Sequence, residues 1–307
     1  MPESSAPRSA VYTALFGGYE TLNDDQVVGD GRVPYICFTD DATLTSAVWD
    51  IRLVAPLFAN DLQRSQRDIK IRGHRDLAQF DATLYIDNSV SLREPPETLV
   101  ERWLESAEIA IPRHSFRETV LDEFIAVVSL ALDDPTRVFE QLQHYSVIAP
   151  GVLRQKPYWN GMIARRNSAA VELTMNRWFD DVLRYSRRDQ LSANFAFSLA
   201  ATKTVGIEID NHGSASHTWP VSLGRVRRPE FGGGAHVPEI AQRRILEAEI
   251  ADLRQRMDQE NRKLNQTIDS MRSSRSWMLT GPLRSAATLL RRLRRSVDSG
   301  TESSTET

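Results

Sequence analysis

Residues 83–90 read Thr83-Leu84-Tyr85-Ile86-Asp87-Asn88-Ser89-Val90, an apolar run that ends in an acid and two small polar residues. β-Branched and aromatic residues in a run of this length predict a buried strand, which becomes polar where it leaves the sheet. The pattern therefore places Asp87 at the carboxyl edge of a sheet. Ligands of open α/β sheets bind outside this edge, so Asp87 is a candidate ligand for a metal or a sugar. A turn that begins at Asp87 and Asn88 is the alternative.

The composition limits the class of protein. The chain has 307 residues, of which 41% are hydrophobic and 26% charged, as in soluble globular proteins. Its net charge of -3 provides no basic field for nucleic acid, and the single Cys37 excludes a disulfide framework. No run approaches the roughly 20 apolar residues of a membrane span, and residues 1–9 lack the apolar core of a signal peptide. We therefore expect a cytoplasmic protein.

A second apolar run precedes a pair of glycines. Residues 10–16 have strand character, and Gly17-Gly18 and Tyr19 follow directly. Glycines at a strand end allow backbone amides to approach a ligand closely. A plain turn is the alternative reading.

Two more strand-like runs come next. Residues 33–39 end in Asp40-Asp41, and residues 49–54 form the following run. An acid at a strand end of a nucleotide-binding sheet can accept hydrogen bonds from ribose hydroxyls. Asp40 and Asp41 are therefore candidates for a nucleoside contact, with a solvated turn as the alternative.

A basic stretch covers residues 62–77 and is expected to be a helix or a loop followed by a helix. Arg67 and Lys70 share one helical face, which His74 extends by another turn. One guanidinium group can bind two phosphate oxygens at once, so this face is a candidate diphosphate site. An exposed basic surface is the alternative.

His114 and Arg117 lie between two segments with helical apolar spacing, residues 99–107 and 119–132. They are candidates to contact a donor phosphate or an acceptor hydroxyl, and a satisfied loop histidine is the alternative. Asp122-Glu123 falls in the first turn of the second helix. Negative charge there offsets the helix dipole, so this pair is predicted to be structural.

A further acid opens a helix. Residues 171–185 form an amphipathic segment that leads to Arg188-Asp189-Gln190, and residues 191–200 continue as a second helical run containing Asn194. An ionised Asp189 could act as a general base toward an acceptor hydroxyl or stabilise positive charge at an anomeric carbon. Arg188 and Gln190 are assigned to the same catalytic group. An ordinary N-cap carboxylate is the alternative.

The ordered series of these motifs resembles a known family. The motifs are YTALFGGYE, ICFTDD, a W-x-I strand, R-x-x-K-I with a following histidine, LYIDNSV, H-x-x-R and RRDQLSANF. Together they are similar to the glycosyltransferase-like domain of plant mucilage proteins and bacterial polysaccharide loci, over residues 10–231. The resemblance implies a single α/β domain with a Rossmann-like fold of the GT-A type. It also implies a bacterial hexosyl- or pentosyltransferase that moves a sugar from a nucleoside diphosphate to a glycan or lipid-linked glycan in surface polysaccharide assembly.

The candidate contacts to the nucleotide sugar follow from these patterns together. They are Tyr12, Thr13, Phe16, Gly17, Gly18, Tyr19, Asp40, Asp41, Arg67, Lys70, His74, Asp87, Asn88, His114, Arg117 and Asn194. GT-A enzymes often use a late histidine as a metal ligand, so the resemblance implies a divalent cation, Mn²⁺ or Mg²⁺, at Asp87 and His212. Asp87-Asn88-Ser89 has only one carboxylate, however, and contact with the donor sugar without a metal is the alternative. A non-catalytic scaffold and a lipid-amide hydrolase are the competing functions.

The last third of the chain has a different pattern. Residues 232–239 form a glycine-containing linker, and residues 240–272 carry apolar residues at alternating spacings of four and three, with Glu260 at one seam position. This spacing is typical of a coiled coil and predicts a homodimer. Packing of the helix on the transferase domain is the alternative.

Residues 273–297 form a tail rich in tryptophan and arginine. It is similar to the S-x-S-W-x-x-T-x-P-L-R tail of bacterial surface-polysaccharide glycosyltransferases. Its basic amphipathic end predicts peripheral contact with the inner face of the cell membrane, and a solvated basic tail is the alternative. Residues 1–9 and 298–307 are expected to be disordered.

Overall fold

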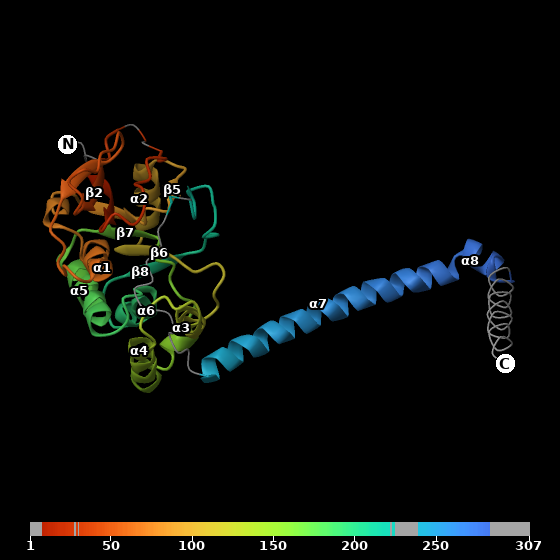
Figure 1. Ribbon diagram of the computed structural model, residues 1–307. Helices are drawn as coiled ribbons and strands as arrows, with labels where there is room; N and C mark the ends of the chain where they lie inside the picture. The colour runs from red at the N-terminus through yellow and green to blue at the C-terminus, as the bar shows by residue number, and fades with distance from the viewer. Residues whose placement is uncertain (1–7, 28, 30, 222, 225–238, 283–307) are drawn as a thin grey trace, which may run out of the picture. The chain divides into compact units, whose positions relative to one another are not determined.

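The computed structural model describes residues 8–27, 29, 31–221, 223–224 and 239–282. The chain divides into two units, residues 1–241 and residues 242–307. Figure 1 shows a sheet flanked by helices in the first unit and one long helix in the second. The predicted α/β class is confirmed for the first unit.

The main sheet has seven strands in the order β3-β2-β1-β4-β7-β6-β8. They are β1 (Ser9–Leu15), β2 (Tyr35–Thr39), β3 (Asp50–Leu53), β4 (Ala82–Ile86), β6 (Ile109–Pro112), β7 (Met162–Arg166) and β8 (Thr204–Ile207). β7 is antiparallel to both of its neighbours, whereas every other adjacent pair is parallel. β5 (Ser91–Leu92) and β9 (His217–Thr218) form a separate antiparallel pair. The strands predicted from residues 10–16, 33–39, 49–54 and 83–86 are all present.

This topology brings several chain segments to one edge. β1, β2 and β4 are parallel, so Gly17, Asp40 and Asp87 follow strands that end on the same side. β7 runs the other way, and its first residue Met162 pairs with the last residue of β4, Ile86. The amino end of β7 therefore lies at the edge where the parallel strands end.

The helices are bounded by recognisable local signals. They are α1 (Leu62–Arg72), α2 (Pro96–Leu104), α3 (Val120–Ser129), α4 (Pro135–Ile148), α5 (Ala169–Arg184), α6 (Gln190–Ser198), α7 (Glu239–Ser273) and α8 (Arg275–Leu279), with short 3₁₀ turns η1 (Arg75–Leu77) and η2 (Val152–Arg154). Asp61 accepts a hydrogen bond from the backbone of Arg64 and caps α1. α1 ends at Arg72 because Gly73 has a φ of 81°, which favours glycine. The basic stretch is thus one helix followed by a 3₁₀ turn.

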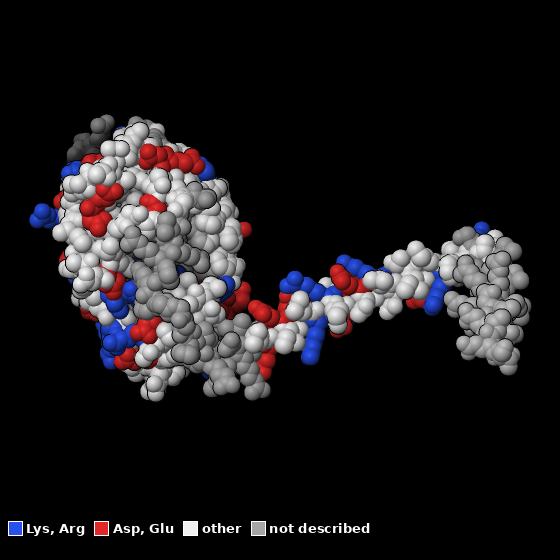
Figure 2. All heavy atoms as spheres, viewed as in Figure 1, with Lys and Arg blue, Asp and Glu red and all other residues white. Residues whose placement is uncertain are grey.

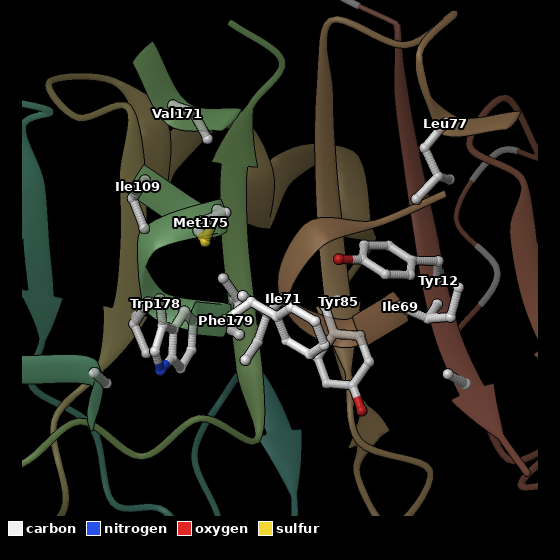
Figure 3. Packing of buried hydrophobic residues seen from close by; sticks show 14 of the residues in the cluster. Tyr12, Ile69, Ile71, Leu77, Tyr85, Ile109, Val171, Met175, Trp178 and Phe179 are labelled. Carbon is white, nitrogen blue, oxygen red and sulfur yellow. The ribbon is translucent and has the colours of Figure 1, made fainter. Parts of the chain in front are cut away.

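Two apolar layers cover the sheet. Residues of α1, α5 and α6 pack on one face, and residues of α2 pack on the other. Figure 3 shows the first layer, in which Tyr12 and Tyr85 of neighbouring strands lie against Ile69 and Ile71 of α1. The ring centroids of Tyr12 and Tyr85 are 5.3 Å apart. This layer fixes α1, the helix that carries Arg67 and Lys70, against the strand that ends at Asp87.

The long C-terminal helix is present as α7, but a coiled coil is not confirmed, because the structure contains this helix once. Its apolar residues remain exposed, and acidic and basic side chains are distributed along it (Figure 2). The exposed apolar positions are Leu246, Ile250, Leu253, Met257, Leu264, Ile268 and Met271. None of the described helices is long and apolar enough to cross a bilayer. Residues 1–7, 225–238 and 283–307, which include most of the predicted linker and basic tail, lie outside the described residues.

Candidate active site

Lys70 is the centre of the site at the carboxyl edge. Its side chain is only 2% exposed, and its Nζ lies 3.1 Å from Asp87 Oδ1 and 3.0 Å from Asp189 Oδ2. Arg67, one turn earlier in α1, places its Nε 3.1 Å from Asp189 Oδ1. We call Arg67, Lys70, Asp87 and Asp189 the Lys70 cluster. It joins α1, the end of β4 and the start of α6.

Asp189 precedes α6, but its side chain makes no capping hydrogen bond to the helix. Both carboxylate oxygens face cations instead, and Asn160 Nδ2 also donates to Oδ2 at 3.3 Å. Burial favours the neutral acid, but Arg67, Lys70 and Arg188 outweigh it and hold the pKa of Asp189 well below its usual range. An acid held so firmly in its charged form is a weak proton acceptor, which argues against the general-base role and for a positioning role.

Tyr85 supports Asp87 from within the sheet. Its hydroxyl donates to Asp87 Oδ1 at 2.7 Å and accepts from Gln66 Nε2 at 2.7 Å. Burial, followed by the charge of Asp87, raises the pKa of Tyr85 well above its ordinary value, so the phenol keeps its proton. Sequence reasoning missed this role. The available signal was the spacing of Tyr85 and Asp87, which puts both side chains on one face of the strand.

Asp87 is the part of the cluster that reaches solvent. Its side chain is 33% exposed, compared with 3% for Asp189. Tyr85 and Lys70 both occupy Oδ1, and no hydrogen bond within the described part of the chain reaches Oδ2. The free oxygen can therefore accept a hydrogen bond from a ligand hydroxyl.

His114, Arg117 and Glu123 form a second group, the Glu123 cluster. Glu123 Oε2 lies 3.5 Å from Arg117 Nε and 3.8 Å from His114 Nε2, beyond ordinary hydrogen-bond distance. Burial raises the pKa of Glu123 against the opposing effect of Arg188 and Arg117. Burial, with the nearby charge of Arg117, lowers the pKa of His114 to about 4, so its imidazole is neutral at pH 7. Asp122 makes the predicted structural contact through a capping box with Thr119, but Glu123 faces the site.

Arg188 is coupled electrostatically to both clusters, because Asp189 and Glu123 each favour its charged form. Around it lie several buried polar atoms without a hydrogen-bond partner among the described residues. These atoms are Arg67 Nε, His114 Nδ1, Arg117 Nε, Asn160 Oδ1 and Arg188 Nε. Buried polar groups are normally satisfied, so this concentration makes the region a candidate ligand site.

Several predicted nucleotide contacts belong to the framework instead. Tyr12, Thr13 and Phe16 are at most 2% exposed, and the Tyr12 hydroxyl donates to the carbonyl of Lys70 at 2.8 Å. Their side chains are buried in the core, and their contact with a ligand stays a prediction. Gly17 and Gly18 keep the expected turn, with φ values of 77° and 57°.

The acids after β2 support turns. Asp40 Oδ1 accepts the N–H of Gly17 at 2.8 Å, which ties the glycine turn to the end of β2. Asp41 accepts from the backbone and hydroxyl of Thr43, at 2.8 and 2.6 Å. The solvated-turn reading holds for Asp41, while Asp40 positions the glycine turn.

Four other candidates are held by local contacts. His74 Nδ1 caps η1, and Gln190 Oε1 accepts from Arg188 at 3.2 Å. Asn88 accepts the N–H of Asn23 and donates to Glu20 and to the carbonyl of Thr21. Asn194 Nδ2 donates to Gln155 and to the carbonyl of Lys156. Of these four, Gln190 contacts a site residue, Arg188, among the contacts that the described residues make.

The residues present do not match a protein-built metal site. In the described ranges, no three His, Cys, Asp or Glu side chains lie close enough together to hold an ion. Asp87 directs Oδ1 to an ammonium group, and the ring of His212 stacks on Phe116, with centroids 4.9 Å apart. The described donor set therefore offers a metal at most one carboxylate oxygen, Asp87 Oδ2, and phosphate oxygens and water would have to supply the other ligands.

The sheet topology and the polar cluster at its carboxyl edge define an α/β protein with a candidate ligand site at the position typical of nucleotide-binding folds. More particularly, the chain belongs to the TOD1/MUCI70, glycosyltransferase-like domain family, whose model matches residues 3–210. It is 27% identical over 219 residues to a probable hexosyltransferase MUCI70 of Arabidopsis thaliana. That alignment covers 63% of this chain and 38% of the plant protein.

Two solved glycosyltransferase structures are also similar to this chain. The apo structure of WbbM, a bifunctional glycosyltransferase, has 12% identity and a TM-score of 0.40, covering 67% of this chain and 40% of that one. Core-mannan synthase A of Aspergillus fumigatus, in a Mn/GDP form, has 10% identity and a TM-score of 0.41, covering 66% and 73%.

Proposed function

We propose that this protein is a glycosyltransferase of the GT-A type that takes a sugar from a nucleoside diphosphate. The observation that carries the proposal is the group of three buried or nearly buried cations, Arg67, Lys70 and Arg188, beside the carboxyl edge where Gly17 and Asp87 lie. Cationic side chains with unsatisfied donors suit phosphate oxygens. Membership of the glycosyltransferase-like family supports the reaction class.

The roles follow from the positions of the residues. Gly17, Gly18 and Tyr19 would contact the nucleoside, since the glycine turn exposes backbone at the edge. Asp87 Oδ2 would accept a hydroxyl of the donor sugar. Asp189 would hold Arg67 and Lys70 in place for the diphosphate, which keeps the leaving group neutralised as its bond to the sugar breaks.

The acceptor would approach from the side of the Glu123 cluster. Phe116 is 40% exposed there, and its ring is nearly parallel to that of Trp219, with an interplanar angle of 16°. Apolar faces of sugars pack on such rings. A glycan or lipid-linked glycan in surface polysaccharide assembly is the acceptor that we propose, at a cytoplasmic site peripheral to the inner face of the membrane.

The exposed apolar positions of α7 support a homodimer, because a narrow apolar stripe is stabilised by a second helix. Sedimentation of the full chain and of Leu253→Asp tests it. We expect a dimer that the substitution dissociates, and a monomeric full chain would contradict the proposal.

Calorimetric titration of UDP and GDP into the full chain tests the enzymatic function. We expect one of the two nucleotides to bind, and Lys70→Met to weaken that binding at least tenfold. Lys156→Met is the matched control, since Lys156 forms an exposed ion pair with Glu208. If neither nucleotide binds with or without Mn²⁺, the transferase proposal is wrong and a non-catalytic scaffold is favoured.

A further inference from the structure

We propose that Arg67, Lys70 and Arg188 neutralise the donor diphosphate in place of a divalent cation, so that nucleotide binding does not depend on metal. This inference rests on the proposed function and specifies how its donor site works. Asp87 then holds Lys70 in place and contacts the donor sugar. Arg188 is a third ligand of the diphosphate, beside Arg67 and Lys70.

The first argument concerns Asp87. A carboxylate can bind a metal through one or both oxygens. Asp87 Oδ1 already accepts from both Tyr85 and Lys70, at 2.7 and 3.1 Å. The ammonium group of Lys70 therefore occupies the position beside Oδ1 that a cation would take. One free oxygen remains, on a single carboxylate.

The second argument concerns the guanidinium groups. Arg188 Nε is buried without a hydrogen-bond partner among the described residues. Arg67 Nε approaches Asp189 to 3.1 Å but lacks hydrogen-bond geometry there. Donors left unsatisfied in a buried site are costly, and phosphate oxygens would satisfy both at once. The two arginines are thus arranged for a ligand with several acceptor oxygens.

The third argument is the charge balance. The four cations Arg67, Lys70, Arg117 and Arg188 face the three carboxylates Asp87, Asp189 and Glu123, which leaves an excess positive charge of one. Burial, together with the neighbouring charge of Arg67, lowers the pKa of Arg188 from its ordinary value, as expected where like charges are held together. An anionic ligand relieves this repulsion, whereas a divalent cation would increase it.

The test is titration of UDP and GDP into the full chain, first with EDTA and then with Mn²⁺ or Mg²⁺. We expect the Kd of the preferred nucleotide to change by less than about threefold between these conditions, which is under 1 kcal/mol. Binding with Mn²⁺ that is lost in EDTA would overturn metal independence and leave the proposed function intact. Absence of binding under every condition would overturn both.

A variant separates the arginine contact from general folding. Arg188→Gln is expected to raise the Kd in EDTA at least tenfold, with no recovery on addition of Mn²⁺, while Arg177→Gln, at an exposed position of α5, leaves it unchanged. Urea unfolding of both variants verifies that they fold. A folded Arg188→Gln protein with normal affinity, or one that Mn²⁺ restores, would contradict the inference.

Asp87→Asn gives an independent readout. The amide keeps a hydrogen-bond acceptor for the donor sugar but removes the charge that a metal ligand needs. We expect UDP and GDP to bind this variant with the same metal independence as the parent. A nucleotide affinity that responds to Mn²⁺ in the parent and no longer does so in Asp87→Asn would assign Asp87 to a metal.

Discussion

The Lys70 cluster and the Glu123 cluster lie at the same edge of the sheet, and they shift the pKa values of their buried carboxyl groups in opposite directions. Asp189 is held by cations at 3.0 and 3.1 Å, which lowers its pKa. Glu123 meets its neighbours only at 3.5 and 3.8 Å, and burial raises its pKa. Both side chains are almost completely buried.

The difference shows that burial alone does not set the protonation behaviour of an acid here. Distance and geometry of the cations decide it, since the Coulomb energy in a poorly hydrated site falls steeply with separation. The first cluster keeps its charges fixed, as a diphosphate site requires. The second holds an acid whose charged form is incompletely compensated.

The largest effect is expected when the Lys70 cluster is broken. Lys70→Met leaves two carboxylates facing each other across a buried space and should cost about 3 kcal/mol of unfolding free energy, at the low end of the range for a broken buried pair because Asp87 is partly hydrated. Urea unfolding measures this cost. Lys156→Met, which removes an exposed pair of equal length, should cost less than about 1 kcal/mol. Equal losses in the two variants would contradict a special role for burial.

A smaller effect with a defined pH dependence is expected for Asp189→Asn. The pKa of Asp189 is lower in the folded than in the unfolded state, so its contribution is present above about pH 4 and is lost as the pH falls below that value. At pH 7 we expect a loss of roughly 2 kcal/mol. The stability difference from the parent should shrink toward pH 3, as urea unfolding at several pH values can measure. A constant difference would show that Asp189 stabilises by packing.

Nucleotide affinity sharpens the role of the same residue. If Asp189 positions Arg67 and Lys70, Asp189→Asn should weaken UDP or GDP binding about tenfold, which calorimetry measures. Asp50→Asn, in an exposed pair with Arg52, is the control. Lost transfer with unchanged nucleotide binding would instead restore the direct role in acceptor activation that the sequence suggested.

The smallest change, of opposite sign, is expected in the other cluster. The pKa of Glu123 is higher in the folded state than in the unfolded state. The contribution of Glu123 to the free energy of unfolding is therefore favourable at low pH and is lost as the pH rises through the pKa of the folded state. Glu123→Gln should therefore stabilise the protein by about 1 kcal/mol at neutral pH, because the neutral amide avoids the desolvation cost of the buried carboxylate. Thermal unfolding at pH 7 and pH 4 tests this, because the gain should diminish at the lower pH. Destabilisation at pH 7 would mean that the two clusters behave alike.

Local sequence patterns predicted much of the framework of the site. The strand that ends at Asp87, the helix that carries Arg67 and Lys70, and the position of Asp189 before α6 all follow from periodicity and chain punctuation. The same patterns assigned Tyr12 to the ligand set, whereas its side chain is buried in the core. They also missed Tyr85, whose spacing from Asp87 was the available signal, because a tyrosine in an apolar strand is most often a core residue.

The sequence alone therefore determined the family, the α/β class and the segments that border the site, since each depends on residues close together in the chain. Only the tertiary structure decided that Lys70 lies between Asp87 and Asp189, and that the cations lie closer to Asp189 than to Glu123. These relations join segments that meet only when α1, β4 and α6 pack together. Differences of less than 1 Å between them determine whether a buried acid is held in its charged form, and no pattern along the chain encodes a distance of that kind.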